Sequence, residues 1–245
     1  MPLDACLFDY GNTLVSTRLN WKRIIPENLS GLSRVLREHF DALDCERLQR
    51  DFLFMRACGR KRAEEDWIET RAIDSLRAAL ALQGRTAPDA LLERAVDGYF
   101  EAEEQAYPII FGIPEALAKL KAMGLTLGVL SNATCGRLVR RALERRNMHH
   151  YFDVVVISAD VGICKPSPVI AHHALSSLQA EPSRCALVGD RIEIDVACAR
   201  SAGLRPVLAD FFGDRLPLPE RDPRPDAVVR TPDDLVNLLS SWRYD

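Results

Sequence analysis

The chain has 245 residues, of which 47% are hydrophobic and 27% are charged, which is ample for one large core or for a core with a smaller partner domain. Its net charge of −3 provides no overall basic field of the kind that favours binding to nucleic acids or acidic membranes. No apolar run approaches the roughly 20 residues that span a bilayer, and the seven cysteines form no C-x-x-C pair. We therefore expect a cytoplasmic monomer or homodimer with a small-molecule partner, and neither a nucleic acid nor a membrane as partner.

The first predicted element is a buried strand at residues 5–8, Ala-Cys-Leu-Phe, which is continuously apolar. Asp9 follows where this strand meets a loop, a position that suits a nucleophile. Gly11 and Thr13 complete this first cluster of residues. Many phosphate-transferring enzymes that begin in this way carry a second Asp two residues after the first, and this chain has Gly11 there.

Residues 16–106 contain no strand-like run, and their apolar residues recur at helical spacing in four stripes. We therefore predict an inserted helical domain over 16–106, and a catalytic core formed by 1–15 and 107–245. An insertion directly after the strand that bears Asp9 lies over the strand ends, where a lid is useful; the alternative is a bundle with no part in catalysis.

After the insertion, short apolar runs near residues 125–130, 154–157, 186–188 and 206–208 alternate with helical stretches. This order predicts an α/β fold with a doubly wound parallel, Rossmann-like sheet, whose ligands bind beyond the carboxyl ends of the strands. A helix near residues 136–146 carries five arginines and an apolar side, which indicates a solvated surface with no catalytic role.

Four polar clusters fall at predicted strand ends, in chain order: Asp9 to Thr13, Ser131-Asn132, Lys165-Pro166, and Gly189-Asp190 with Asp195. Each alone is weak evidence, because such residues also cap helices and form turns. Together they match the needs of phosphoryl transfer, in which a carboxylate must approach an anionic phosphorus centre and a cation must reduce the repulsion.

The acidic residues of these clusters are candidate ligands of Mg²⁺. Asp9 and Asp190 can hold the ion between them, and Gly11 can offer its backbone carbonyl. Asp195 is a further candidate, although its position five residues after Asp190 favours holding the metal's waters or Lys165. Lys165 balances the carboxylates and can contact phosphoryl oxygens, as can Ser131 and backbone N–H groups at a helix start.

These stretches resemble the haloacid dehalogenase (HAD) superfamily of aspartate-nucleophile hydrolases, in the subclass with a helical cap after the first motif. The resemblance covers nearly the whole chain and includes Leu7 to Leu14, Leu130-Ser131-Asn132, Val161 to Pro166, and Val188-Gly189-Asp190 through Asp195. It implies that Asp9 forms an aspartyl-phosphate, that Ser131 and Lys165 bind phosphate, and that Mg²⁺ lies on Asp9, Asp190 and the Gly11 carbonyl. Thr13 and Asn132 are the remaining candidate substrate-binding residues.

Gly11 departs from the family pattern, since most phosphatases of this type have an Asp there that protonates the leaving group. Three functions remain open: a Mg²⁺-dependent phosphatase acting on a small phosphorylated metabolite, another chemistry of the family such as dehalogenation or phosphonate cleavage, and a catalytically idle metal- or phosphate-binding protein. We expect a phosphatase, because the other motifs are intact and some sugar-phosphate phosphatases of the family have Gly at this place.

Overall fold

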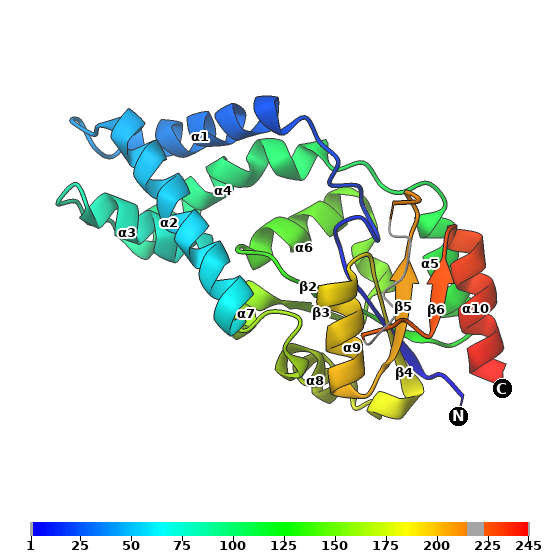
Figure 1. Ribbon diagram of the computed structural model, residues 1–245. Coiled ribbons are helices and arrows are strands. Elements are labelled where there is room, and N and C mark those ends of the chain that lie inside the picture. Colours follow the sequence, from blue (N-terminus) through cyan, green and yellow to red (C-terminus); the bar gives the residue numbers. More distant parts are fainter. Residues whose placement is uncertain (1, 215–222, 245) are drawn as a thin grey trace.

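The computed structural model describes residues 2–214 and 223–244, and its centre is a six-stranded sheet in which every strand runs parallel to its neighbours (Figure 1). The strand order is β3-β2-β1-β4-β5-β6. The bounds are β1 Ala5–Phe8, β2 Thr126–Ser131, β3 Val154–Ile157, β4 Cys185–Gly189, β5 Arg205–Ala209 and β6 Ala227–Val229. The predicted α/β fold with a doubly wound parallel sheet is thus confirmed, and the short edge strand β6 is an addition to it.

Helices cover both faces of the sheet, which explains why the strands are continuously apolar. One face packs against α5 (Ile113–Ala122), α6 (Gly136–Arg145) and α10 (Pro232–Tyr244), and the other against α8 (Pro168–Leu178) and α9 (Ala197–Ala202). Strand β1 supplies both cores by alternation: Cys6 and Phe8 join the first cluster, while Ala5 and Leu7 join the second. All four side chains of β1 are buried, so the residue that follows it is held at a rigid strand end.

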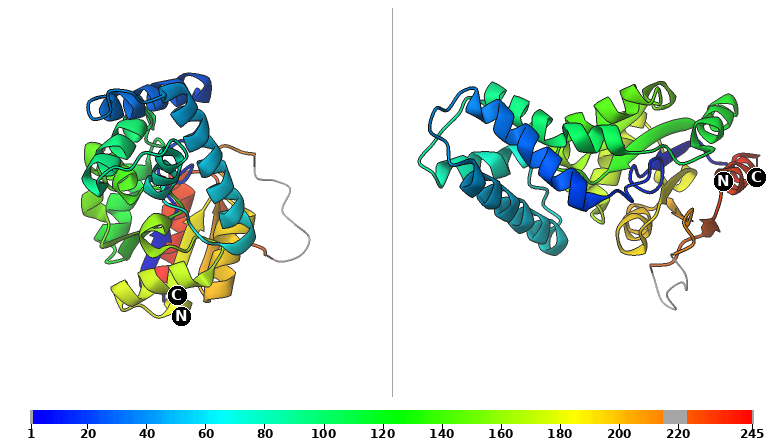
Figure 2. Two further views of the ribbon diagram at one scale, coloured as in Figure 1. Left: turned by 90° about the vertical axis from the view of Figure 1, so that its left-hand side faces the viewer. Right: turned by 90° about the horizontal axis from the view of Figure 1, so that it is seen from above.

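The inserted segment forms four helices, α1 (Trp21–Arg37), α2 (Cys45–Asp66), α3 (Ala72–Ala81) and α4 (Asp89–Ala106). They lie together to one side of the sheet, away from both chain ends (Figures 1 and 2). Helices α1 and α4 approach closely at Gly31 and Gly98, where a Cβ on Gly31 would lie 2.1 Å from the Gly98 carbonyl oxygen. The four predicted helical stripes correspond to these four helices, whereas the division into 1–15 with 107–245 and 16–106 as domains stays a prediction.

Two sets of contacts join these helices to the rest of the molecule. The arginines of α6 pair with acids of α4, namely Arg137 with Glu93 and Asp97, Arg141 with Asp97 and Glu104, and Arg145 with Glu104. On the far side, the backbone after α2 pairs with the segment before Lys165: Cys164 N donates to Trp67 O at 2.9 Å, and Glu69 N donates to Gly162 O at 3.0 Å. The arginine face of α6 is thus solvated, with 40%, 31% and 55% of the side chains of Arg137, Arg141 and Arg145 exposed, and in addition it joins α6 to α4 through ion pairs.

Several short elements lie between the main ones. They are α7 (Ser158–Val161), two 3-10 turns (His149–Tyr151 and Pro182–Arg184) and a π-helical turn (Ile192–Val196) that leads into α9. The helix predicted over 195–202 therefore begins earlier, and with a wider turn. Among the described residues, no helix has the length and apolarity needed to cross a membrane.

Candidate active site

The carboxyl ends of three central strands bring the predicted residues together. Strand β1 pairs on one side with β2 and on the other with β4, with Phe8 opposite Val129 and Val188. The backbone N–H of Asp9 donates to Val188 O at 2.8 Å, which extends the pairing by one residue. Because parallel strands end at the same edge, Ser131 as the last residue of β2 lies at this edge with Asp9 and Asp190, which directly follow β1 and β4.

Lys165 occupies the centre of the cluster, although it is a lysine with only 1% of its surface exposed. Its Nζ donates to Asp9 Oδ1 at 2.7 Å and to Asp195 Oδ1 at 2.6 Å. The two carboxylates raise the pKa of Lys165 above its usual range, even though burial alone lowers it. The ammonium is therefore a fixed positive charge between two acids that lie 186 positions apart in the sequence, and the prediction that Lys165 balances the carboxylates agrees with its position.

Asp195 is held by several groups at once. Its Oδ1 accepts from Lys165 Nζ, and its Oδ2 accepts from Arg191 N at 3.0 Å. A Cβ on Gly189 would lie 2.2 Å from Asp195 Cγ, so only glycine at the end of β4 allows this close approach. Both oxygens of Asp195 thus accept hydrogen bonds from the protein, which suits an anchor for Lys165 better than a direct metal ligand.

Asn12 supports Asp190, a contact that the sequence did not predict. Asn12 adopts a left-handed backbone with φ 56°, and its Nδ2 donates to Asp190 Oδ2 at 3.3 Å. Its Oδ1 accepts from the backbone N–H and the hydroxyl of Thr17, both at 3.0 Å. Asn is one of the few residues that tolerates this backbone region, and this is the only signal by which the position could have been found.

The donor set fits a divalent cation. One oxygen from each of Asp9, Asp190 and Asp195 lies within 4.8 Å of the others, and all three residues are at most 9% exposed. The cluster contains three carboxylates and one ammonium, that of Lys165, so its negative charges outnumber its positive charge when all are ionised. Burial, with Asp195 and Asp190 adding to it, raises the pKa of Asp9 to about 7, even though Lys165 lowers it. Hard oxygen ligands with surplus negative charge are what Mg²⁺ prefers.

The remaining predicted residues lie around this cluster. Ser131 ends β2, is 4% exposed, and makes no side-chain hydrogen bond with the described residues. Asn132 donates from Nδ2 to Lys165 O and accepts from Lys165 N at its Oδ1, both at 2.8 Å, so its amide fixes the backbone of Lys165. Thr13 is fully buried, and its hydroxyl has no hydrogen-bond partner in the part of the chain described. Their roles in binding substrate stay predictions.

Gly11 lies beside the cluster in a turn closed by the backbone. Asn12 N donates to Val15 O at 2.6 Å, and Leu14 N donates to Tyr10 O at 2.9 Å. A Cβ on Gly11 would meet only Thr17 Cγ2, at 3.0 Å. The position therefore has room for a larger residue after a shift of a few tenths of an ångström, and the backbone does not require glycine there.

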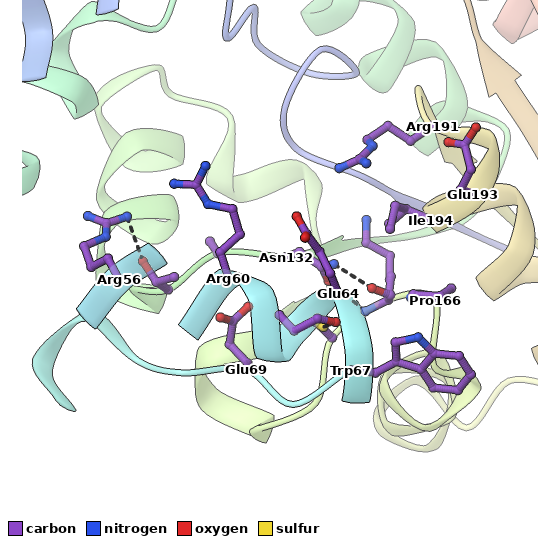
Figure 3. Close-up of a pocket in the computed structure, with 15 residues that line it drawn as sticks. Arg56, Arg60, Glu64, Trp67, Glu69, Asn132, Pro166, Arg191, Glu193 and Ile194 are labelled. Carbon is purple, nitrogen blue, oxygen red and sulfur yellow. Dashed lines mark hydrogen bonds between the residues drawn. The ribbon is translucent and has the colours of Figure 1, made fainter. Parts of the chain in front are cut away.

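A cavity of about 490 Å³ opens next to Lys165 (Figure 3). Helix α2 supplies Arg56 and Arg60, and the linker after it supplies Trp67 and Glu69. The opposite wall comes from the loop after β4, which supplies Arg191, Glu193 and Ile194 (Figure 3). This volume is within the range of sites for small metabolites, and the helical insertion forms one of its walls.

The sequence comparisons agree with the motifs. A family model of haloacid dehalogenase-like hydrolases matches residues 3–203. A phosphoserine phosphatase of Thermus thermophilus is 36% identical over 124 residues, which cover 51% of this chain and 49% of that protein. A glyceraldehyde 3-phosphate phosphatase of Methanopyrus kandleri is 33% identical, over 63% of this chain and 66% of its own length. The chain thus spans about half to two thirds of the length of these relatives.

Solved structures share the fold over nearly the full length. A 2-haloacid dehalogenase of Pseudomonas syringae pv. Tomato DC3000 superposes with a TM-score of 0.69 and 23% sequence identity, covering 98% of this chain and 99% of its own. At this identity the likeness concerns the arrangement of the strands and helices, and the chemistry has to be argued from the side chains of the site.

Proposed function

We infer that this chain, which belongs to the haloacid dehalogenase-like hydrolase family, is a Mg²⁺-dependent phosphatase that hydrolyses a phosphomonoester of a small metabolite through an aspartyl-phosphate on Asp9. The observation that carries this proposal is the buried ammonium of Lys165 between Asp9 and Asp195, with Asp190 close by. Dehalogenation needs no cation and does not require Asp190, so the surplus of carboxylates favours phosphoryl transfer. The phosphatase names of the relatives point in the same direction.

Asp9 would attack the phosphorus in line, so that an acyl phosphate forms as the bond from phosphorus to the ester oxygen breaks, and the leaving oxygen would take a proton from water to depart as the alcohol. Lys165 holds Oδ1 of Asp9 and so orients the carboxylate, which leaves Oδ2 for the attack. Ser131, at the adjacent strand end, would bind a phosphoryl oxygen, as would Lys165. Water then hydrolyses the acyl phosphate and restores Asp9.

Asp9, Asp190 and the carbonyl of Gly11 would hold Mg²⁺, and Asp195 would hold Lys165 in place. When bound, Mg²⁺ supplies the positive charge that screens the phosphoryl oxygens and favours the ionised form of Asp9. Asn132 would act through Lys165, whose backbone it fixes, and Thr13 through the first loop.

We further propose a cytoplasmic protein acting as a monomer or homodimer, without a nucleic acid or a membrane as partner. Its seven cysteines are all free, which suits a reducing compartment. The proposed helical cap over 16–106 would cover the cavity during catalysis.

The nucleophile is tested with Asp9→Asn, which keeps the shape of the side chain. Turnover of an aryl phosphate and of a panel of phosphorylated metabolites should fall by about 10⁴-fold or more. A circular dichroism spectrum and a thermal unfolding midpoint close to those of the unaltered protein would show that the fold is kept. Undiminished turnover by this variant would refute the mechanism, while release of halide or cleavage of a phosphonate by the unaltered protein would support the other chemistries.

The missing acid is tested with Gly11→Asp, since a Cβ at this position would meet only the side-chain methyl of Thr17, at 3.0 Å. If proton transfer to the leaving group limits turnover, the variant should hydrolyse alkyl phosphates faster, by up to the roughly 10² to 10⁴ that a general acid contributes. Aryl phosphates, whose leaving groups need less help, should gain less. Gly11→Asn is the matched control, because it has the same size and cannot donate that proton; an equal gain with Asn would contradict the explanation.

A further inference from the structure

Arg56 brings a positive charge to the cavity without a counter-ion. Its Nη2 donates to Thr134 Oγ1 at 3.4 Å, and its Nη1 is buried without a hydrogen-bond partner. No carboxylate of the described residues lies within 4.0 Å of it. The guanidinium carbon lies over the rings of Phe52, Tyr99 and Phe100, at 5.7, 4.9 and 5.1 Å from their centroids. The aromatic faces hold this cation in place and do not neutralise it.

Two acids, Glu69 and Glu103, feel the charge of Arg56, but both accept hydrogen bonds from other groups. The charge of Arg56 acts to lower the pKa of Glu69 and of Glu103, but burial raises both pKa values overall. Each carboxylate accepts hydrogen bonds elsewhere, Glu69 from Ser158 and the Thr70 N–H, and Glu103 from Tyr107 and Asn28. Arg56 therefore lines the cavity with a charge that no carboxylate of the described residues contacts.

Arg60 extends the same wall. It lies four residues after Arg56 on α2, which places both side chains on one face of the helix. Arg60 lines the cavity, and it forms no ion pair within the described part of the chain. Lys165, by contrast, is already paired with Asp9 and Asp195. The unpaired positive charge on this side of the cavity thus comes from α2.

We propose that the substrate carries a second anionic group, remote from the transferred phosphoryl group, and that Arg56 and Arg60 bind this group. This inference rests on the proposed phosphatase function. A cavity of about 490 Å³ has room for several carbon atoms between the two groups. The planar fork of a guanidinium pairs with a carboxylate or a phosphate through two parallel hydrogen bonds. The substrate class is therefore a small phosphorylated acid or a bisphosphate.

The experiment compares substrates that differ in one group. In 3-phosphoglycerate a carboxylate stands where glycerol 1-phosphate has a CH₂OH group, and 1,3-propanediol bisphosphate tests a second phosphate at a similar distance. The variants are Arg56→Met, Arg60→Met, which alters an exposed side chain with little risk to folding, and Arg62→Met. Arg62 is the matched control, because it is an exposed arginine of the same helix that does not line the cavity.

For the anionic substrates we expect Arg56→Met and Arg60→Met to lower kcat/KM by about 10- to 100-fold, as is typical for loss of a charged hydrogen bond. Glycerol 1-phosphate should lose less than about threefold with either variant, and Arg62→Met should alter neither class. If kcat/KM falls for 3-phosphoglycerate alone, the two arginines bind a carboxylate. If it falls for the bisphosphate alone, they bind a phosphate. Equal losses for charged and uncharged substrates, or no loss, would overturn the inference while leaving the phosphatase intact. Failure of the unaltered protein to hydrolyse any phosphomonoester would instead overturn the proposed function, and the inference with it.

Discussion

Replacing Lys165 by Met should destabilise the protein in a pH-dependent way. The ammonium lies 2.7 Å from Asp9 Oδ1 and 2.6 Å from Asp195 Oδ1. At an effective dielectric constant near 20, each contact corresponds to a gross attraction of about 6 kcal/mol. Removing the ammonium also removes its own desolvation penalty of several kcal/mol, so the net loss in the free energy of unfolding should be about 3 to 5 kcal/mol. For a chain of this size, that corresponds to a fall in Tm of roughly 6 to 20 °C.

The sign of the pH dependence follows from Asp9. Its pKa is raised from 3.8 to about 7 in the folded protein, so protonation of Asp9 favours folding, and this stabilisation is lost as the pH rises from about 4 through 7. Lys165 lowers this pKa, and its removal moves the upper end of the range to higher pH. The Lys165–Asp195 contact remains when Asp9 is protonated, so the loss of stability in the variant should be present at pH 5 but smaller there than at pH 8.

Thermal unfolding followed by circular dichroism at pH 5, 6.5 and 8, in EDTA so that no divalent cation intervenes, measures this difference. Lys61→Met is the control, because Lys61 is an exposed lysine of α2 whose contact with Glu65 is 3.6 Å long. Its Tm should change by no more than a few degrees at any pH. An unchanged Tm for Lys165→Met at pH 8, or a loss of equal size at pH 5, would refute the reasoning.

Two further changes test the packing around the site. Gly189→Ala places a Cβ 2.2 Å from Asp195 Cγ, so it should displace Asp195 from Lys165, lower kcat by about 10²-fold and cost roughly 1 to 3 kcal/mol of stability; normal kcat would contradict the tight approach. Glu104→Gln removes the charge of an acid that is 2% exposed and pairs with Arg141 and Arg145, so urea unfolding should show a loss of roughly 1 to 3 kcal/mol. Glu101→Gln, which alters an exposed pair with Arg34, should cost less than about 1 kcal/mol, and equal losses in the two glutamate variants would argue against the burial explanation.

The sheet was predictable because five of its six strands read as continuous apolar runs, and four of them, β1, β2, β4 and β5, are buried over nearly all of their length. Strand β6 was not, since it has three residues, lies at the edge, and is only partly buried. The arginine face of α6 shows the limit of local patterns: its ion-pair partners on α4 lie about 40 positions earlier, so nothing near the arginines predicts that this solvated face also contacts α4.

At the site, residue types at strand ends predicted which side chains gather, because parallel strands bring their carboxyl ends to one edge. The detailed contacts depend on backbone geometry that has no clear signal in the sequence. The π-helical turn brings Asp195 N to Arg191 O at 2.8 Å and returns the Asp195 carboxylate to Arg191 N. In the sequence, Arg56 and Arg60 are only two members of a basic run on the insertion, and the cavity that they share with Lys165 exists only once α2 is placed against the loop after β4.

The backbone bonds between Trp67–Glu69 and Gly162–Cys164 have a mechanical consequence. They join the end of α2 to the segment directly before Lys165, and Ala72 N donates to Thr134 O at 2.8 Å just beyond them. A movement that lifts α2 away from the cavity must either break these bonds or pull on the segment that carries the ammonium. If the bonds hold, we expect that uncovering the cavity also loosens the contact of Lys165 with Asp9, so that the nucleophile is best oriented while the cavity is covered.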